Sequence, residues 1–471
     1  MPTEQRCEIL VIGAGPGGYV AAIRAGQLKK KVIIVEKDRW GGLCLNYGCI
    51  PSKALLYASE IIETIHKGEK YGIKAEKLSI DINQLREKKR KVVSQLVLGV
   101  ETLLKHNGAS MILGEASFVE PNLVKVVTSQ GEEVRIIADN ILIATGSLPF
   151  SVPSLPLDGK LIITSKEALE IPFVPKKMLV VGGGYVGMEM GVVYHSLGSE
   201  VTVMEMLDSI FLATDAQIVR MAQDRFKKKG INILTKTKVE KAQVTKDNKV
   251  QVTAISDGKS ENMDFDLILV AIGHKATTTN LGLEKIGVQT DARGFIKVDE
   301  KMQTNIKNIF AVGDCAGKQL LAHKAYREGE VAAEVASGMD SEMDYRVVPY
   351  AIFTQPEVAG VGLTEKEAID QGFKIKVGTY PYRAIGRAVG MDEQEGLVKI
   401  VADSESDEIL GAHIIGALAS ELISSITVAM GLDARVEDVA EIIQVHPTLS
   451  EMIKEASLAV NKRAIHNLNP K

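Results

Sequence analysis

Cysteine is scarce in this chain, with four residues among 471. This low content excludes a secreted scaffold stapled by disulfides. It predicts a reducing, cytoplasmic compartment, where a clustered pair of cysteines is more often catalytic than structural. The chain also lacks an apolar run of about 18 residues, so no transmembrane helix is expected. Its N-terminus has no basic stretch followed by an apolar segment, and we therefore expect no signal peptide.

A dominant charge of one sign is missing as well. Lys+Arg 56 against Asp+Glu 60 give a formal net charge of −4. This balance creates no overall field toward nucleic acid or membrane, so neither is expected as a partner. A basic run, REKKRK, lies within the helical pattern of residues 80–106. We interpret it as a solvated helix face rather than a nucleic-acid patch.

The chain does have length, an ordinary composition and many glycines. Hydrophobic residues make up 45% and charged residues 25%, and there are 42 glycines. These values are typical of a globular protein. At roughly 100 to 200 residues per domain, the length predicts about three domains.

Two segments repeat one pattern of buried strand, glycine turn, helix and second buried strand. They are residues 7–37 and 178–206. Apolar runs of this kind, bounded by glycine and charged residues, suit parallel strands covered on both faces. The proline-rich stretch around Pro149, Pro153 and Pro156 is interpreted as a crossing between the two units. Two nucleotide-binding domains are therefore predicted.

The first glycine turn contains Gly13, Gly15 and Gly18, spaced as G-x-G-x-x-G. The first glycine allows the tight turn, the second lets a pyrophosphate approach the backbone, and the third lets the helix pack on the strand. The phosphates then lie at the positive N-terminus of the helix. An acid, Glu36, ends the next strand and can accept both hydroxyls of an adenosine ribose. We predict a dinucleotide site.

The second turn contains Gly182, Gly184 and Gly187, followed by the acid Glu205. A carboxylate suits the free 2′-hydroxyl of NAD and repels the 2′-phosphate of NADP. The residues after it, Met-Leu-Asp, offer no arginine for such a phosphate. NAD is therefore expected rather than NADP. Two such sites in one chain require two dinucleotides, and FAD with NAD is the usual pair.

Cys44 and Cys49 lie close together in the sequence. Neither a second cysteine pair nor a nearby histidine pair completes a zinc site, so we expect no metal. A redox disulfide fits better than two unlinked buried cysteines. In a regular helix, residues five apart have Cα atoms roughly 8 to 9 Å apart, beyond the reach of a disulfide. The segment must therefore bend, which Gly48 allows, and Pro51 suits the first turn of the helix that follows.

The cysteine segment GGLCLNYGCIPSK resembles the active-site segment of the pyridine nucleotide–disulfide oxidoreductases. Further segments match in order, and the resemblance covers essentially the whole chain: ILIATG, TNIKNIFAVGDCAG, LLAHKAYREG, IFTQPEVAGVGLTE and HPTLSE. The family consists of flavoenzymes that keep a dithiol or disulfide beside the flavin. The C-L-N…G-C-I-P-S-K-A-L-L run, Glu205 and HPTLSE are most similar to members that oxidise dihydrolipoamide to lipoamide with NAD.

The resemblance implies an α/β fold with two Rossmann-like three-layer nucleotide-binding domains and a C-terminal α+β dimerisation domain. The expected FAD-binding domain is 1–150, and the NAD-binding domain is 151–279. Residues 280–345 would form a central domain that completes the FAD site, and 346–471 the interface domain.

The resemblance also implies a role for individual residues. Cys49 would face the flavin, and Cys44 would be the interchange thiol that meets the substrate. Lys53 would approach the flavin N5 and pair with Glu189. The other residues expected to bind FAD or NAD are Gly42, Gly146, Tyr185 as a gate over the nicotinamide, Gly273, Asp314 on the ribityl chain, and Ala322 at a helix start.

His446 and Glu451 in HPTLSE resemble the catalytic His–Glu dyad of the family. An imidazole can carry a proton near neutral pH when a carboxylate fixes its tautomer. In the family this dyad faces the cysteines of the other subunit, so the resemblance implies a homodimer. The implied partners are a lipoyl group, free or on a lipoyl-domain protein, and possible components of a 2-oxoacid dehydrogenase or glycine cleavage system.

The chain departs from the family pattern at several positions. Leu43 stands where threonine is usual, and Tyr47 where a small residue is usual, which weakens the expected substrate fit. The common G-R-x-P is replaced by residues 273–276, GHKA. A reductase of another disulfide with NAD therefore remains an alternative activity, and a docking subunit of a 2-oxoacid dehydrogenase complex is an alternative of another class. Cys7 and Cys315 are interpreted as packing residues.

Overall fold

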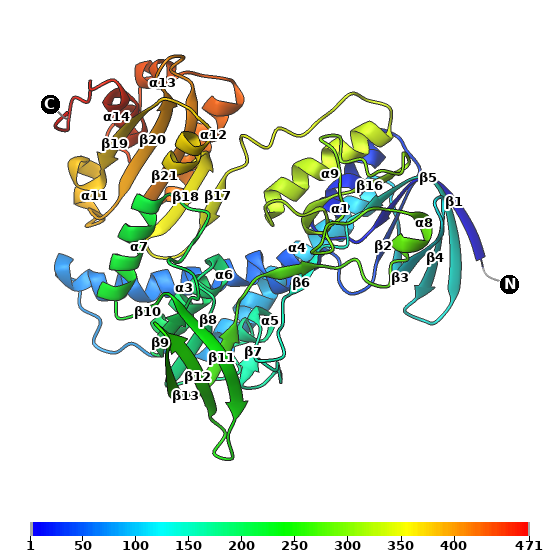
Figure 1. Ribbon diagram of the computed structural model, residues 1–471, viewed down its shortest axis with the longest axis horizontal. Helices are drawn as coiled ribbons and strands as arrows, with labels where there is room; N and C mark the ends of the chain where they lie inside the picture. The colour runs from blue at the N-terminus through cyan, green and yellow to red at the C-terminus, as the bar shows by residue number, and fades with distance from the viewer. Residues whose placement is uncertain (1–2, 470–471) are drawn as a thin grey trace.

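A computed structural model describes residues 3–469 of the chain. Figure 1 shows three groups of strands, each with its own helices, and the two ends of the chain lie at opposite ends of the molecule. Within the described residues, no helix combines the length and the apolar character that crossing a bilayer requires.

The first sheet has the strand order β1-β2-β3-β4-β5-β16, with β1 also paired to β5. Its strands are β1 Thr3–Ile12, β2 Val32–Glu36, β3 Ser110–Glu120, β4 Leu123–Thr128, β5 Glu133–Ile143 and β16 Ile309–Ala311. β1 pairs parallel to β2 and β5, while β4 pairs antiparallel to both of its neighbours. The apolar ends of β1 and β2 are buried because α1 (Pro16–Gln27) and α9 (Ala322–Ala336) pack together on this sheet.

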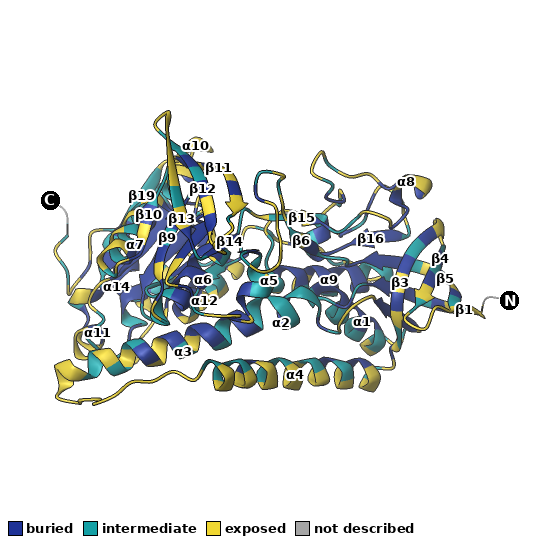
Figure 2. Cartoon of the chain, turned by 90° about the horizontal axis from the view of Figure 1, so that it is seen from below, coloured by how far each residue is buried: buried dark blue, intermediate teal, exposed yellow. Residues whose placement is uncertain are grey.

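Two long helices run along one side of the molecule, as Figure 2 shows. They are α3 (Cys49–Lys67), which follows the short α2 (Gly42–Tyr47) and precedes the 3-10 helix η1 (Gly68–Tyr71), and α4 (Ile82–His106). Asp81 begins α4 by accepting the backbone N–H groups of Asn83 and Gln84. The basic run on α4 is not wholly solvated, because Lys89 is buried and binds the carbonyl of Leu169 at 2.8 Å.

The second sheet is parallel, with the order β10-β9-β8-β14-β7. Its elements are β7 Ile162–Ile163, α5 Ser165–Ala168, β8 Lys177–Val181, α6 Tyr185–Ser196, β9 Glu200–Met204, α7 Ala216–Lys228, β10 Asn232–Leu234 and β14 Leu267–Val270. An antiparallel three-stranded sheet packs beside it: β11 Thr237–Val244, β12 Val250–Ser256 and β13 Lys259–Phe265. The two predicted dinucleotide units are thus both three-layered.

The crossing between the first and second sheets is a two-stranded ribbon. β6 (Ser147–Pro149) carries the chain out, and β15 (His274–Ala276) brings it back antiparallel. The proline-rich stretch follows β6 directly, as predicted. After β15, the short α8 (Leu283–Ile286) precedes the return of the chain to the first sheet at β16, and the 3-10 helix η2 (Gly313–Ala316) follows β16.

The third sheet is antiparallel, with the order β17-β18-β21-β20-β19. Its strands are β17 Tyr350–Ile352, β18 Glu357–Gly362, β19 Ile375–Pro381, β20 Leu397–Asp403 and β21 Ile409–Gly416. The helical segments are α10 Glu365–Asp370, η3 Tyr382–Ala384, α11 Gly386–Gly390, α12 Ala419–Gly431, α13 Val436–Glu441 and α14 Glu451–Val460. This arrangement confirms the predicted α/β class with a C-terminal α+β unit.

Candidate active site

One cavity between the first and second sheets gathers many of the predicted site residues. Its lining includes Gly13, Gly15, Glu36, Gly42, Cys44, Cys49, Lys53, Gly146, Tyr185, Glu189, Asp314 and Ala322. These residues come from β2, α2, α3, α6, η2, α9 and the turns between elements. The fold therefore brings the first glycine turn and the cysteine pair to the same space.

The first glycine turn is built for close backbone contact. Gly13 has φ +102°, and a Cβ there would lie 2.3 Å from the carbonyl oxygen of Ala144. A Cβ on Gly18 would lie 1.9 Å from the carbonyl oxygen of Gly13, so the third glycine lets α1 pack on the turn. Both positions therefore exclude a side chain, as the fingerprint predicts.

Glu36 is buried and holds this turn. One carboxylate oxygen accepts the Ala14 N–H at 2.7 Å, and the other accepts the Asp38 N–H at 2.9 Å. A carboxylate has about four acceptor positions. Two of them are therefore left for the hydroxyls of a ribose.

Other features of this cavity also fit a dinucleotide. Gly42, with φ +59°, packs so closely that its Cβ would lie 2.5 Å from the Cα of Gly15. The start of α2 thus meets the start of α1, and both starts line the cavity. The hydroxyl of Thr277 lines the cavity, is buried and has no hydrogen-bond partner among the described residues. A buried hydroxyl of this kind is normally satisfied, so it suits a ligand.

The cysteine segment bends where predicted. α2 ends at Tyr47, Gly48 has φ −140° and ψ −114°, and α3 begins at Cys49 with Pro51 in its first turn. The thiols of Cys44 and Cys49 interact with each other. A hydrogen bond from Cys44 lowers the pKa of Cys49, and the charge of Lys53 lowers it further, against the effect of burial. The same contact raises the pKa of Cys44. Of the two thiols, Cys49 is thus the one whose pKa is lowered.

Lys53 lies one helical turn beyond Cys49 and forms an ion pair with Glu189 of α6. Its Nζ lies 2.9 and 2.8 Å from the two carboxylate oxygens. The predicted pairing is therefore present in the structure. Phe353, which sequence reasoning missed, joins it: its backbone N–H donates to Glu189 at 3.0 Å, and its ring centroid lies 4.5 Å from Nζ. No local motif marks this contact because its three members lie far apart in the sequence.

The remaining residues predicted for the cofactor lie around the same cavity. Asp314 accepts a hydrogen bond from the hydroxyl of Ser147 at 2.6 Å. Helix α9 begins at Ala322, after the cap residue Leu321, as predicted. The Tyr185 side chain is 40% exposed, and its hydroxyl lies 3.4 Å from the carbonyl oxygen of Leu320. Tyr185 therefore stands at the open edge between α6 and the start of α9.

The departures from the family pattern lie on this cavity too. Leu43 and Tyr47 both line it, so they face the cofactor space as well as the cysteines. The Tyr47 ring lies 4.5 Å from Nζ of Lys166 and 5.7 Å from Cζ of Arg39. His274, in the altered GHKA segment, lines the cavity of the first turn, where burial lowers its pKa.

The second glycine turn repeats the first, and its glycines do not line this cavity, although Tyr185 and Val186 beside them do. Gly182 has φ +106°, and a Cβ there would lie 2.4 Å from the carbonyl oxygen of Ala271. A Cβ on Gly187 would lie 2.3 Å from the carbonyl oxygen of Gly182. Glu205 accepts the N–H of Gly183 at 2.7 Å and that of Leu207 at 2.8 Å. Gly273, with φ +110°, precedes β15 nearby in the chain.

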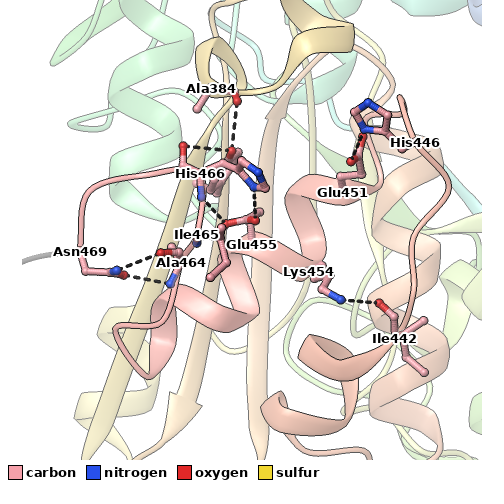
Figure 3. A network of polar contacts seen from close by, with 11 residues as sticks. Ala384, Ile442, His446, Glu451, Lys454, Glu455, Ala464, Ile465, His466 and Asn469 are labelled. Carbon is pink, nitrogen blue, oxygen red and sulfur yellow. Dashed lines mark hydrogen bonds and ion pairs between the residues drawn. The ribbon is translucent and has the colours of Figure 1, made fainter.

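His446 and Glu451 form a hydrogen-bonded pair at the start of α14, as Figure 3 shows. The Nδ1 of His446 lies 2.9 Å from Oε1 of Glu451, whose other oxygen accepts the Thr448 N–H at 2.9 Å. These bonds lower the pKa of Glu451, although burial alone would raise it. The His446 side chain is 79% exposed and does not line the cavity of the cysteines. Within one described chain, the dyad and the thiols are thus separate.

Two dinucleotide turns, a bent dithiol segment beside the first, and an exposed His–Glu pair together define a dinucleotide-dependent disulfide oxidoreductase. Residues 7–329 match the Pyridine nucleotide-disulphide oxidoreductase family, and residues 348–457 match the dimerisation domain of that family. The chain belongs to the pyridine nucleotide–disulphide oxidoreductases.

Similar proteins extend over nearly the full length of the chain. It is 42% identical over 462 residues to dihydrolipoyl dehydrogenase 2 of Haloarcula marismortui, covering 98% of both chains. It is 42% identical over 459 residues to dihydrolipoyl dehydrogenase of Geobacillus stearothermophilus, covering 98% of this chain and 97% of that one. The crystal structure of LpdA from Mycobacterium tuberculosis is 27% identical, with a TM-score of 0.90 over 97% of this chain and 99% of that chain.

Proposed function

We propose that this chain oxidises dihydrolipoamide to lipoamide with FAD as resident cofactor and NAD as final acceptor. The observation that carries the proposal is the placement of Cys44 and Cys49 in the cavity of the first dinucleotide turn. The proteins that are 42% identical over almost the whole chain carry the name dihydrolipoyl dehydrogenase. The match to a dimerisation domain indicates a homodimer.

The two thiols have different roles in this reaction. One thiolate of the substrate attacks Sγ of Cys44 in the Cys44–Cys49 disulfide, and Cys49 leaves as a thiolate. The second substrate thiol then attacks the mixed disulfide, closes the lipoamide ring and releases Cys44. The substrate thus loses two electrons and the cysteine pair gains them. The lowered pKa of Cys49 supports its role as the leaving thiolate.

FAD, when bound, accepts two electrons from the dithiol and supplies them to NAD as hydride equivalents. Gly13, Gly15, Gly18 and Glu36 would hold its adenosine and pyrophosphate. The residues that would hold its remaining parts are Gly42, Lys53, Gly146, Asp314 and Ala322. The Lys53–Glu189 pair would keep a cation beside the reacting sulfur of Cys49.

NAD would bind at Gly182, Gly184 and Gly187, with Glu205 on its ribose and Gly273 at the edge of the site. Tyr185 would cover the nicotinamide position until NAD arrives. Its exposed ring at the start of α6 supports this gating role. Glu205, which carries the preference for NAD, keeps free acceptor positions beyond its two backbone bonds.

His446 would accept the proton of the attacking substrate thiol, and Glu451 would hold its ring. The exposed imidazole lies away from the thiols of its own chain, so we propose that it serves the thiols of the partner subunit. Because each site would then need both chains, a monomer would be inactive. Long apolar side chains before this dyad are exposed, including Ile442, Ile443 and Val445 at 58%, 91% and 73%, and such a surface suits an interface.

The finer assignments are part of the same proposal. The substrate would be a lipoyl group, free or carried by a lipoyl-domain protein of a 2-oxoacid dehydrogenase or glycine cleavage system. The buried thiols of Cys7 and Cys315 support a reducing, cytoplasmic location. We propose the domain divisions 1–150, 151–279, 280–345 and 346–471, which place each sheet largely within one segment.

Steady-state kinetics of the purified flavoprotein test the proposed activity. In the oxidising direction with NAD, dihydrolipoamide should give a kcat/KM at least about 100-fold above that of other dithiols. In the reverse direction with NADH, lipoamide should exceed other disulfides by the same factor. A Cys44→Ser variant should lose at least about 1,000-fold, since the interchange thiol is covalently involved. A higher kcat/KM for another disulfide would favour the alternative substrate. If no member of the panel turned over while a 2-oxoacid dehydrogenase complex bound the chain, a docking role would be favoured.

A further inference from the structure

Three parts of the fold meet at one ion pair. Lys53 comes from α3, which packs against α6, Glu189 comes from α6 of the second sheet, and Phe353 follows β17 of the third sheet. Glu189 is 3% exposed, and Oε1 accepts both the Lys53 ammonium at 2.9 Å and the Phe353 N–H at 3.0 Å. The carboxylate is therefore fixed from two directions by separate units of the molecule.

The ring of Phe353 provides a second fixed contact for Lys53. Its centroid lies 4.5 Å from Nζ, inside the about 6 Å range over which an aromatic face attracts a cation. The Lys53 side chain is 32% exposed and lines the cavity that Cys49 also lines. A long, flexible ammonium chain in a partly open cavity has many alternative positions, and two fixed partners restrict them.

The position of this ammonium matters because the ion pair acts on Cys49 in two opposing ways. The positive charge of Lys53 favours the Cys49 thiolate, while the negative charge of Glu189 disfavours it. Coulomb energies fall with distance, so the net effect depends on which charge is nearer. The other titratable groups that interact electrostatically with Cys49 are Cys44, Tyr185 and Tyr326. They lie outside the contact with Phe353.

We propose that Phe353 is a positioning residue of the redox centre. Its ring holds the Lys53 ammonium and its N–H holds the Glu189 carboxylate, so that the ammonium stays near Cys49. The third sheet thereby contributes to the dithiol site of its own chain. The inference rests on the proposed role of Lys53, and it adds a residue that does not touch the reacting atoms.

Replacing the ring tests the proposal in the holoenzyme. Phe353→Leu keeps the backbone N–H and most of the volume but removes the aromatic face. The measurement is the pH midpoint of the thiolate–flavin charge-transfer absorbance in the two-electron-reduced protein. We expect the midpoint to rise by roughly half a pH unit, the size of a partly exposed cation–π contact. Phe353→Tyr, which keeps the face, should restore the wild-type midpoint.

A matched control separates this effect from a general loss of packing. Phe373→Leu makes the same chemical change in the same part of the chain, at a phenylalanine that is 38% exposed and away from the cavity lining. Its charge-transfer midpoint should equal that of the wild type. Pentafluorophenylalanine at position 353 is a second probe that keeps the shape of the ring and reverses its quadrupole. It should raise the midpoint at least as far as leucine does.

Lys53→Met distinguishes failure of the inference from failure of the proposed function. If Lys53→Met shifts the midpoint and Phe353→Leu adds nothing in that background, Phe353 acts through Lys53. If Lys53→Met shifts the midpoint while neither replacement of Phe353 does, the positioning role is wrong and the role of Lys53 stands. If Lys53→Met itself has no effect, the proposed role of Lys53 fails, and the inference fails with it.

Discussion

The two dinucleotide turns of this chain are nearly the same at the level of the backbone. Each first glycine has φ above +100°, and in each an added Cβ would meet the carbonyl of the residue just after a strand at 2.3 or 2.4 Å. Each acid accepts two backbone N–H groups, one within the glycine turn and one two residues beyond itself. The chain therefore contains two copies of the same dinucleotide-binding turn, about 170 residues apart in the sequence.

The surroundings of the two turns are different. Gly15 in the first turn meets Gly42 of the α2 start, and Glu36 is 8% exposed. Gly184, at the same position of the second turn, has no atom within 4 Å of an added Cβ. Met206, next to Glu205, is 65% exposed. The first turn is enclosed by other elements, whereas the second is open on the side where a ligand would lie.

This difference indicates that recognition of a dinucleotide and its retention depend on different features of the site. The glycines and the acid decide what kind of molecule is bound, and both turns have them. Enclosure decides how readily it leaves, because a covered ligand loses more contact with water and needs the cover to move. The enclosed turn suits a cofactor that stays, and the open turn suits one that exchanges in every cycle.

The largest effect on ligand binding is expected when the first glycine of each turn is replaced by valine. Gly13→Val should reduce the flavin bound per chain at least about 100-fold, because the backbone strain at positive φ adds to an overlap with Ala144. Gly182→Val should keep the flavin and abolish saturation by NAD. Flavin absorbance per chain and titration with NAD measure the two effects. Loss of flavin from both variants would show that the turns are not independent.

A smaller effect is expected when the acids are replaced. Glu205→Ala should reduce the preference for NAD over NADP, measured as the ratio of kcat/KM, by about 10- to 100-fold. The bound flavin should remain, since Glu205 does not line its cavity. Glu36→Ala is the matched change in the enclosed turn and should weaken FAD without altering that ratio. An unchanged ratio in Glu205→Ala would remove the role given to this carboxylate.

The smallest effect is predicted for Gly184→Ala. Its φ of −72° suits any residue, and the space beside it is open. The free energy of unfolding should therefore change by no more than about 0.5 kcal/mol. The KM for NAD should still rise roughly threefold to tenfold, because the methyl group occupies the approach of the pyrophosphate. A large drop in melting temperature would mean that Gly184 serves the fold rather than the ligand.

Much of this arrangement is predictable from local sequence. The two glycine turns, the bend at Gly48, the helix start at Ala322 and the crossing after Pro149 are each set by residues within a few positions of one another. Glycine at positive φ and proline in a first helical turn have strong local preferences. The Lys53–Glu189 pair was expected only from family resemblance, since 136 residues separate its members.

The features that sequence reasoning missed depend on contacts between distant segments. Phe353 contributes through its N–H and its ring face, which its own neighbourhood does not reveal. Lys89 lies in a basic run of a helix, yet it is buried because a carbonyl and a carboxylate of residues 169–170 reach it. His274 follows the second sheet in sequence but lines the cavity of the first. In each case the partner comes from a different packing unit.

The antiparallel pairing of β6 with β15 makes the second sheet a topological insertion, because the chain leaves and re-enters the first sheet at one place. Strand β5 ends at Ile143, and β16, its neighbour at the edge of the sheet, begins only at Ile309. At a typical synthesis rate, that interval corresponds to roughly 10 to 30 s on the ribosome. Throughout this time the β5 edge is unpaired and open to wrong partners. Fast, autonomous folding of the inserted unit would let β16 pair with β5 without further delay once it has been synthesised.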